Sequence, residues 1–169
     1  MPNKELTGYP SIDKPWLKYY SETERNYTIP KCKIVDNLYK YIDKYSSETA
    51  LEFMNVKVSY AEVKQRIELV AKSLKELGVK DGDTISVCLP NMPEAVYLFY
   101  AINKVGAVAN MLDPRNSNAE FLRLLKEADT TYLFAMDTAV ENFADVIRDA
   151  KLKGVITISI IESLPLLIR

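Results

Sequence analysis

Hydrophobic and polar residues follow one another along this chain with two different spacings. Hydrophobic positions three or four residues apart are typical of a helix that buries one face, and they recur in five segments, at residues about 33–45, 59–77, 92–104, 117–128 and 138–147. Alternating or short hydrophobic runs are typical of strands, and they occupy residues 51–54, 56–59, 84–89, 107–112, 131–134 and 154–158. The pattern therefore predicts a chain in which strands and helices alternate.

Residues that commonly cap a helix stand at the start of four of these segments, and a glutamate follows each cap in the first turn. The pairs are Ser59 with Glu62, Asn91 with Glu94, Ser117 with Glu120, and Thr138 with Glu141. Gly78 and Gly106 follow two of the helices, where glycine commonly ends a helix in a left-handed conformation. We therefore expect these helix ends to be sharply defined.

Four strand–helix repeats with short connections predict a parallel sheet, because right-handed crossovers place the helices against its faces. We predict a doubly wound α/β fold: a mostly parallel sheet, helices on both faces, and a short hairpin around Asn55. The helix at 92–104 is hydrophobic nearly all round, so Leu98, Phe99 and Ile102 are expected to be buried. The strand at 107–112 is expected to be covered on both faces.

Three parts are expected along the chain. Residues 1–32 place prolines among aromatic residues such as Trp16 and Tyr27, and they are predicted to form an irregular arm that covers apolar surface of the body. Residues 33–158 are predicted to form a partial α/β subdomain, and residues 159–169 an apolar tail. Such an arm could also stack on nucleic-acid bases, but no excess of basic residues accompanies its aromatic side chains.

Composition narrows the class of protein. The chain has 169 residues, of which 48% are hydrophobic and 27% are charged, and this composition suits about one globular domain. Its 22 basic and 23 acidic residues leave a formal net charge of -1, which argues against a nucleic-acid partner. The hydrophobic runs are too short to span a membrane, and the first residues lack the pattern of a signal peptide. With only Cys32 and Cys88, we expect a reducing, cytoplasmic location.

Two absences exclude several kinds of site. The chain has no histidine, so triads, proton shuttles and metal sites that need an imidazole are excluded within it. Its five glycines form no phosphate-binding loop: Gly78 and Gly82 have the wrong spacing, and the Asp83 that follows would repel a phosphate. We predict that the chain holds no catalytic, cofactor-binding or metal-binding residue of its own.

The candidate chemistry lies at the carboxyl ends of the predicted strands, where ligands bind in open α/β sheets. Asp113 and Asp137 could hold Mg²⁺ or accept a phosphoryl group, but both stand where aspartate commonly starts a turn or a helix, and we favour that role. Arg115 could bind a carboxylate or phosphate, although a lone loop arginine is more often solvated. Glu94 belongs to a predicted cap, and Cys88 is expected to be an inert core thiol.

A resemblance adds to this picture. The order and spacing of several segments resemble the N-terminal portion of the AMP-forming acyl-CoA synthetases, members of the adenylate-forming, AMP-binding superfamily. The segments are Ser59–Val63, Ala71–Asp83, Val87–Glu94, Ala101–Val108, Leu112–Pro114, and Ser117–Glu120 through Ala128–Asp129. The resemblance covers residues 33–158, and residues 8–16 resemble the arm of bacterial members.

The resemblance implies an enzyme that uses Mg²⁺ and ATP to convert a carboxylic acid to an acyl-adenylate and then transfers the acyl group to coenzyme A. The family's catalytic motifs, which include a Ser/Thr/Gly-rich loop ending in Pro-Lys, match no segment here. We therefore predict that this chain is an inactive N-terminal scaffold fragment of a ligase. The alternatives are a fragment of a peptide-synthetase adenylation domain and a stand-alone, receiver-like binding or regulatory module.

The last residues are unusually apolar. Between positions 158 and 169 the charged residues are Glu162 and Arg169, and the hydrophobic ones are Ile158, Ile160, Ile161, Leu164, Leu166, Leu167 and Ile168. Exposed apolar surface of this kind usually finds a partner. The sequence favours self-association with a second copy, through a two-fold contact or an exchanged tail, over a tail that folds back on its own sheet.

Overall fold

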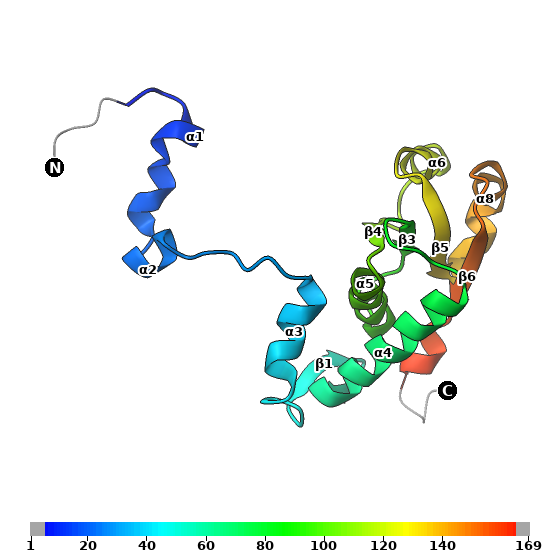
Figure 1. Ribbon diagram of the computed structural model, residues 1–169. Coiled ribbons are helices and arrows are strands. Elements are labelled where there is room, and N and C mark those ends of the chain that lie inside the picture. The colour runs from blue at the N-terminus through cyan, green and yellow to red at the C-terminus, as the bar shows by residue number, and fades with distance from the viewer. Residues whose placement is uncertain (1–5, 165–169) are drawn as a thin grey trace. The chain divides into compact units, whose positions relative to one another are not determined.

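The computed structural model of this chain describes residues 6–164. The chain divides into two compact units, Met1–Lys31 and Cys32–Arg169, and each is described by itself. The first unit contains the helix α1 (Pro10–Asp13), the 3₁₀ helix η1 (Pro15–Tyr19) and the helix α2 (Glu22–Arg25). The second unit contains all of the strands (Figure 1).

The first unit is less irregular than the sequence predicted. Ser21 begins α2 with a full capping box, in which the Glu24 N–H donates to Ser21 Oγ and the Ser21 N–H donates to Glu24 Oε2 at 2.7 Å. Asp13 accepts hydrogen bonds from the N–H groups of Thr7 and Gly8. None of the three helices buries a residue. Local hydrogen bonds rather than a core therefore shape this segment, and such bonds produce no hydrophobic period.

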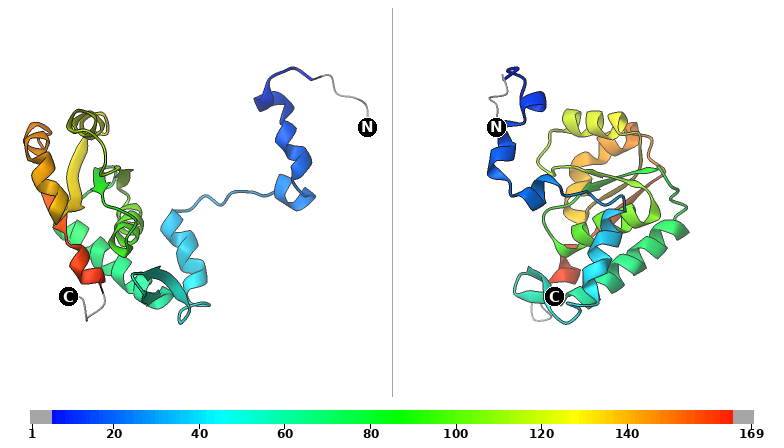
Figure 2. Two further views of the ribbon diagram at one scale, coloured as in Figure 1. Left: turned by 180° about the vertical axis from the view of Figure 1, so that it is seen from behind. Right: turned by 60° about the vertical axis from the view of Figure 1, so that its left-hand side comes forward.

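The second unit is built on a parallel four-stranded sheet, as the sequence predicted. Its strands lie in the order β4-β3-β5-β6. Their bounds are Thr84–Cys88 for β3, Val108–Met111 for β4, Thr130–Met136 for β5 and Gly154–Ile158 for β6. The chain adds β4 on one side of β3 and then β5 and β6 on the other, so the crossovers cover opposite faces of the sheet (Figures 1 and 2).

Helices cover both faces of this sheet. One core cluster gathers α3 (Ile34–Ile42), α4 (Tyr60–Glu76) and α5 (Pro93–Val105), and it includes Ile85 and Val87 of β3. The other gathers α6 (Asn118–Glu127), the 3₁₀ helix η2 (Glu141–Phe143) and α8 (Ala144–Asp149), and it includes Cys88. Because successive strand residues point to opposite faces, β3 contributes to both cores.

A two-stranded hairpin precedes the sheet. Strands β1 (Thr49–Phe53) and β2 (Val56–Ser59) pair antiparallel and turn through Met54 and Asn55, whose φ angles are 49° and 65°. Two positive φ angles are what a tight hairpin turn requires. Ser59 ends β2 and caps α4: its N–H donates to Glu62 Oε2 at 2.8 Å, and its Oγ accepts from the Glu62 N–H at 3.3 Å. This predicted capping box is confirmed.

Two predicted caps are wrong. Met92, not Asn91, is the N-cap residue of α5, and its side chain makes no capping hydrogen bond. Pro93, the first residue of the helix, has no N–H, so the first turn has one donor fewer to satisfy. Thr138 lies inside a short helix, α7 (Asp137–Val140), and does not precede it. The chain then forms η2 and α8, so three short helices replace the single helix predicted here. Both errors arise because the pattern of a cap is short and also occurs by chance inside loops and first turns.

Two burial predictions are also wrong. The strand β4 lies at the sheet edge, so Val108 and Met111 keep 53% and 48% of their surface exposed. On α5, Leu98 and Ile102 are buried as predicted, but Phe99 is only half-buried and lines a cleft. A hydrophobic run does not show which strand the chain places at the edge of a sheet, and this explains the first error.

Residues after β6 begin with the 3₁₀ helix η3 (Ile160–Ser163). Ser159 caps it by accepting a hydrogen bond from the Ile161 N–H, and Ile160 packs against the α4–α5 core. Ile161 is 53% exposed. The rest of the predicted tail, residues 165–169, lies outside the described residues.

Candidate functional site

The carboxyl ends of the parallel strands lie together at one edge of the sheet, as expected, but the two aspartates predicted there are not neighbours. Asp113 follows β4 and Asp137 follows β5, and β3 runs between these strands. At a strand spacing of ~4.8 Å, roughly 10 Å separates the two strand ends. The prediction treated strands that follow one another in sequence as neighbours in space, and the return of the chain across β3 makes that assumption wrong.

Asp113 and Arg115 bind each other. Arg115 donates from Nη2 to Asp113 Oδ2 at 2.6 Å and from Nε to Oδ1 at 3.0 Å, and its backbone N–H donates to Oδ1 at 2.9 Å. The hydrogen bonds from the Arg115 side chain lower the pKa of the Asp113 carboxyl to about 2. The Arg115 side chain is 88% exposed. The pair closes a surface turn, which supports the structural role favoured from the sequence.

Asp137 likewise has a local role. Its Oδ1 accepts a hydrogen bond from the Thr138 N–H at 2.7 Å, at the start of α7. Across residues 6–164, no three His, Cys, Asp or Glu side chains are grouped so that they could hold a metal ion. The strand ends therefore provide no carboxylate cluster for Mg²⁺ in the described part of the chain.

Cys88 is a buried core thiol, as predicted. The residue is 0% exposed, and burial, followed by the nearby negative charge of Asp113, raises the pKa of its thiol to about 11. Because the thiolate is the reactive form, Cys88 is a poor nucleophile at neutral pH. Cys32 is exposed and also free.

Glu94 joins the first turn of α5 to the end of the described chain. Its Oε1 accepts a hydrogen bond from Ser163 Oγ, and its Oε2 is buried without a hydrogen-bond partner among the described residues. The sequence pattern predicts a helix cap for Glu94 and not this contact. Residues 69 positions apart in sequence form it, and no local pattern indicates such a pair.

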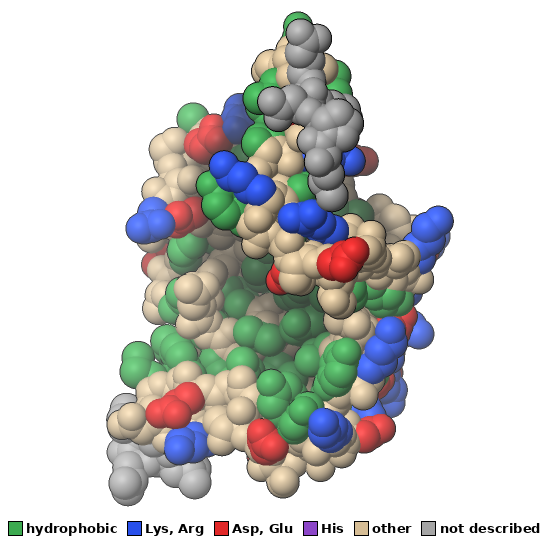
Figure 3. All heavy atoms as spheres, turned by 90° about the vertical axis from the view of Figure 1, so that its left-hand side faces the viewer, with side chains coloured by type: hydrophobic (Ala, Val, Ile, Leu, Met, Phe, Trp, Pro, Cys, Tyr) green, Lys and Arg blue, Asp and Glu red, His purple; other side chains and the backbone are tan. Residues whose placement is uncertain are grey.

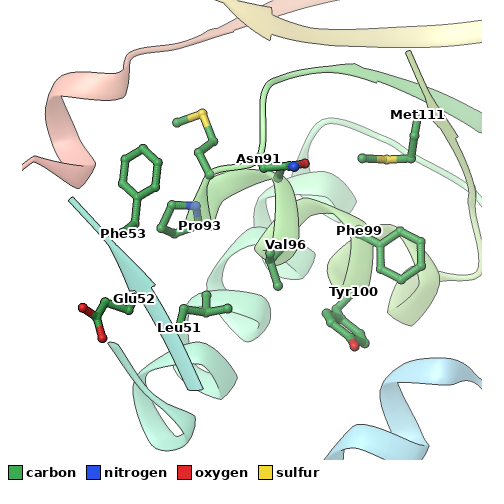
Figure 4. A pocket seen from close by; sticks show the side chains of 11 residues that line it. Leu51, Glu52, Phe53, Asn91, Pro93, Val96, Phe99, Tyr100 and Met111 are labelled. Carbon is green, nitrogen blue, oxygen red and sulfur yellow. The ribbon is translucent and has the colours of Figure 1, made fainter. Parts of the chain in front are cut away.

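An apolar cleft of about 480 Å³ lies between β1, α5 and the end of β4. Its lining residues are Leu51, Glu52, Phe53, Asn91, Met92, Pro93, Ala95, Val96, Phe99, Tyr100 and Met111. Leu51 and Phe53 point from one face of β1 toward α5, whereas Glu52 points the other way (Figure 4). On the face drawn in Figure 3, hydrophobic side chains gather around a hollow, and charged side chains lie mostly at its margins.

No local sequence pattern predicts this cleft. Its walls come from a hairpin, a helix and an edge strand, and their meeting is a tertiary event. One signal was present: α5 is hydrophobic nearly all round, so it carries more apolar surface than one face of a sheet covers. Phe99 and Tyr100 lie on that additional surface, and their rings pack edge to face with centroids 5.3 Å apart.

A cluster of charged side chains around one tyrosine ring joins α3, α4 and α5. Lys104 Nζ of α5 lies 3.1 Å from Glu68 Oε1 of α4, and the ammonium groups of Lys64 and Lys104 lie 5.4 and 5.0 Å from the centre of the Tyr39 ring. Burial, with the negative charge of Glu68, raises the pKa of Tyr39. The cations lie over the ring face, where cation–π attraction stabilises the packing of the three helices.

Comparison with known proteins shows which family the chain matches. Residues 38–167 match a family model described as AMP-binding enzyme. A 2-succinylbenzoate–CoA ligase of Bacillus cereus is 31% identical over 109 residues, which are 61% of this chain and 23% of that ligase. The 4-coumarate–CoA ligase 1 of Solanum tuberosum is 29% identical over 107 residues, 63% of this chain and 19% of that ligase. The chain thus spans about a quarter or less of these curated relatives.

Solved structures share the fold. The structure of the anthranilate CoA ligase AuaEII in complex with anthranoyl-AMP matches with a TM-score of 0.71 and 22% identity, over 77% of this chain and 26% of that chain. A long-chain-fatty-acid-CoA ligase from Archaeoglobus fulgidus matches with a TM-score of 0.72 and 21% identity, over 78% of this chain and 28% of that chain. At these identities the likeness shows the shared α/β fold.

Proposed function

Because this chain belongs to the family of AMP-binding enzymes, whose model matches residues 38–167, we propose that it forms the N-terminal scaffold of an ATP-dependent acyl-CoA ligase. The parent enzyme would join a carboxylic acid to AMP, release pyrophosphate, and then pass the acyl group to coenzyme A. The family match is the observation that carries the proposal, and the names of the CoA ligases among the relatives support it.

Within this proposal, the described residues support the site rather than form it. ATP and Mg²⁺ are implied by the family, but the described residues do not fit them: Asp113 is held by Arg115, and no group of side chains suited to a metal is found in residues 6–164. After Gly106 the sequence has one further glycine, Gly154, so it offers no glycine-rich loop for a triphosphate. The sheet and its helices would then be the rigid frame against which the nucleotide and acyl sites pack.

The proposal also covers where the parent protein works. No helix in the described part of the chain has the length and apolar character needed to cross a bilayer. Cys32 and Cys88 are both free thiols, one exposed and one buried. From the two free thiols we propose a reducing, cytoplasmic location for the parent enzyme, and fractionation of the source cells would test it.

Acid-dependent exchange of pyrophosphate into ATP tests the function. We expect no exchange above background by purified residues 1–169 with fatty, aromatic or amino acids, because the donors that stabilise developing charge in such reactions are absent. The product of the complete reading frame should exchange with a fatty or aromatic acid and form its CoA thioester. Exchange with amino acids alone would instead indicate a peptide-synthetase adenylation domain. A complete frame that binds no ATP would support a stand-alone module and overturn the proposal.

A further inference from the structure

The edge strand β4 has one side that pairs with no other strand of the described chain. Its other side pairs with β3 in a regular parallel register (Figure 1). On that paired side, the N–H groups of Val108 and Leu112 donate to backbone carbonyl oxygens at 2.8 and 2.9 Å. Because backbone groups alternate in direction along a strand, the N–H and C=O groups of Ala109 and Met111 point away from β3, toward the open side.

This edge lacks the features that usually keep an open strand from pairing with another chain. Soluble proteins protect such edges with charged side chains, prolines or bulges. The sequence of β4 is Val-Ala-Asn-Met, and its register with β3 has no bulge. The next charged residue along the chain, Asp113, is already bound to Arg115. The edge is therefore uncharged, and a further strand can be added to it.

The side chains of β4 divide between the two faces of the sheet. Ala109 packs against the α4–α5 core, and Met111 lines the apolar cleft, so both lie on the α5 face. Asn110 lies on the other face, where its Nδ2 donates to Ser86 Oγ at 3.0 Å. Antiparallel pairing of two such strands about a two-fold axis at Asn110 sets Ala109 of each copy opposite Met111 of the other. A small side chain then lies beside a large one, and no charge faces its own kind.

We propose that this chain self-associates through β4, which pairs antiparallel with β4 of a second copy and joins the two four-stranded sheets into one. Ala109 and Met111 of each copy then exchange both of their outward hydrogen bonds with Met111 and Ala109 of the other. The sequence favoured the apolar tail as the self-associating surface, whereas the described residues supply the edge of the sheet. The proposal is independent of the ligase function, because it concerns only the surface of this chain.

The pairing also involves the apolar cleft. Met111 is 48% exposed and forms one wall of the cleft. In the paired arrangement β4 of the second copy lies beside that wall on the same face, so the two clefts adjoin and the Met111 side chains lose contact with water. A strand of 4 residues gives a small interface, so we expect a dimer that forms in concentrated solution and dissociates on dilution.

Cysteine cross-linking tests the register of the pair. The probe is the 169-residue chain with Cys32→Ser and Asn110→Cys, in which the remaining cysteine, Cys88, is buried. Asn110 lies on the two-fold axis as a non-hydrogen-bonded pair, whose Cα atoms are ~4.5 Å apart and within the range of a disulfide. We therefore expect a disulfide-linked dimer in a mildly oxidising buffer.

Val108→Cys in the same Cys32→Ser chain is the matched control. Val108 lies on the same strand and the same face as Asn110, and it is the more exposed of the two. In the proposed register, however, about 14 Å separates it from its counterpart, which is too far for a disulfide. We expect it to cross-link at least about tenfold more slowly than Asn110→Cys.

A charge on the edge tests the strength of the pairing. Met111→Lys places an ammonium group where natural edge strands often carry one, and it should raise the Kd of the dimer at least about tenfold. Leu69→Lys adds the same charge at a position of α4 that is 52% exposed, and it should leave the Kd unchanged. Sedimentation equilibrium across a dilution series measures both values, and denaturant unfolding checks that both variants fold cooperatively.

The results expected under the proposal are a dimer that dissociates on dilution, cross-links faster through Asn110→Cys than through Val108→Cys, and is weakened by Met111→Lys. A chain that stays monomeric at every concentration would overturn it. A dimer that cross-links equally at both positions, or that a folded Met111→Lys variant leaves intact, would also overturn it, because the contact would then lie on another surface. If Met111→Lys does not fold, the two cross-linking rates decide the question alone.

Discussion

At the scale of single residues, two positive-φ glycines show how differently neighbouring positions constrain the chain. Gly82 and Gly106 have φ angles of 82° and 86°, and the Gly82 N–H donates to the Gly106 carbonyl oxygen at 3.0 Å. A Cβ at Gly82 would meet nothing within 4 Å, whereas one at Gly106 would lie 1.9 Å from Asp81 Oδ1. Both positions need a left-handed backbone, and at Gly106 a Cβ would in addition require the exposed Asp81 side chain to move.

We therefore expect Gly106→Ala to destabilise the protein more than Gly82→Ala. The left-handed conformation alone costs a residue with a Cβ ~1–2 kcal/mol at either position, and at position 106 the exposed Asp81 side chain must also rotate away, which adds a smaller cost. Urea unfolding of both variants gives the comparison. Adding Asp81→Ala to Gly106→Ala should recover part of the difference, and a double variant as unstable as the single one would show that the clash is not the cause.

Asp113 should titrate well below an ordinary aspartate. Its pKa is about 2 in the folded chain because Arg115 donates hydrogen bonds to the carboxylate, so its contribution to stability is present above the unfolded pKa, ~3.9, and is lost as pH falls toward 2. NMR titration of the side-chain carboxyl would measure the value. In Arg115→Ala the pKa should rise toward the ordinary range, and an unchanged pKa would mean that another group lowers it.

At the scale of elements, α5 shows how one helix can serve two surfaces. Leu98 is 2% exposed and lies in the α4–α5 core, whereas Phe99 is half-buried and faces the apolar cleft. The sequence predicted burial for both because the helix is hydrophobic nearly all round. The sequence shows which positions of a helix are apolar. How the helix lies in the fold determines which neighbours cover each of these positions.

Leu98→Ala should therefore be more destabilising than Phe99→Ala, although phenylalanine is the larger residue. Truncation of a fully buried leucine costs ~2–5 kcal/mol, and for the half-buried Phe99 we expect about 1–3 kcal/mol. Denaturant melts of the two variants, with equal m-values as the check on two-state unfolding, measure the order. The reverse order would mean that Phe99 is covered in solution by another segment or another copy.

At the scale of the whole molecule, stability should concentrate in the middle of the sheet. Strands β3 and β5 each pair on both sides, and Ser86 of β3 also joins Thr130 of β5 and Asn110 of β4 through side-chain hydrogen bonds of 2.7 and 3.0 Å. The edge strand β4 pairs on one side and keeps half of Val108 exposed. Buried, fully paired strands open last in native proteins.

Native-state hydrogen exchange tests this distribution. Amides of Ile85 and Val87 in β3 should exchange at least about tenfold more slowly than the unpaired amides of β4, because they open only with the whole domain. Ser86→Ala removes the shared hydroxyl and should lower the free energy of local opening of β4, so that its amides exchange faster. The amides of β3 and β5 should still exchange most slowly. Uniform exchange across all four strands would show that the sheet has no stable centre.

Local sequence patterns predicted the strands and the longer helices of the second unit, together with the class of its fold. Strand and helix periods, the Ser59–Glu62 capping box and the stop at Gly106 depend on residues within one or two helical turns, so they can be read locally, and alternation then leads to a parallel sheet. The family resemblance followed from the order of the same segments.

Which elements become neighbours could be known from the three-dimensional structure alone. The passage of the chain across β3 separates Asp113 from Asp137 and places β4 at the edge of the sheet. The contact between Glu94 and Ser163 and the cleft between β1 and α5 are further meetings of distant segments. Each of these depends on pairs of segments far apart in sequence. Hydrophobic burial is non-directional, so a pattern can say that a surface must be covered without saying which segment covers it.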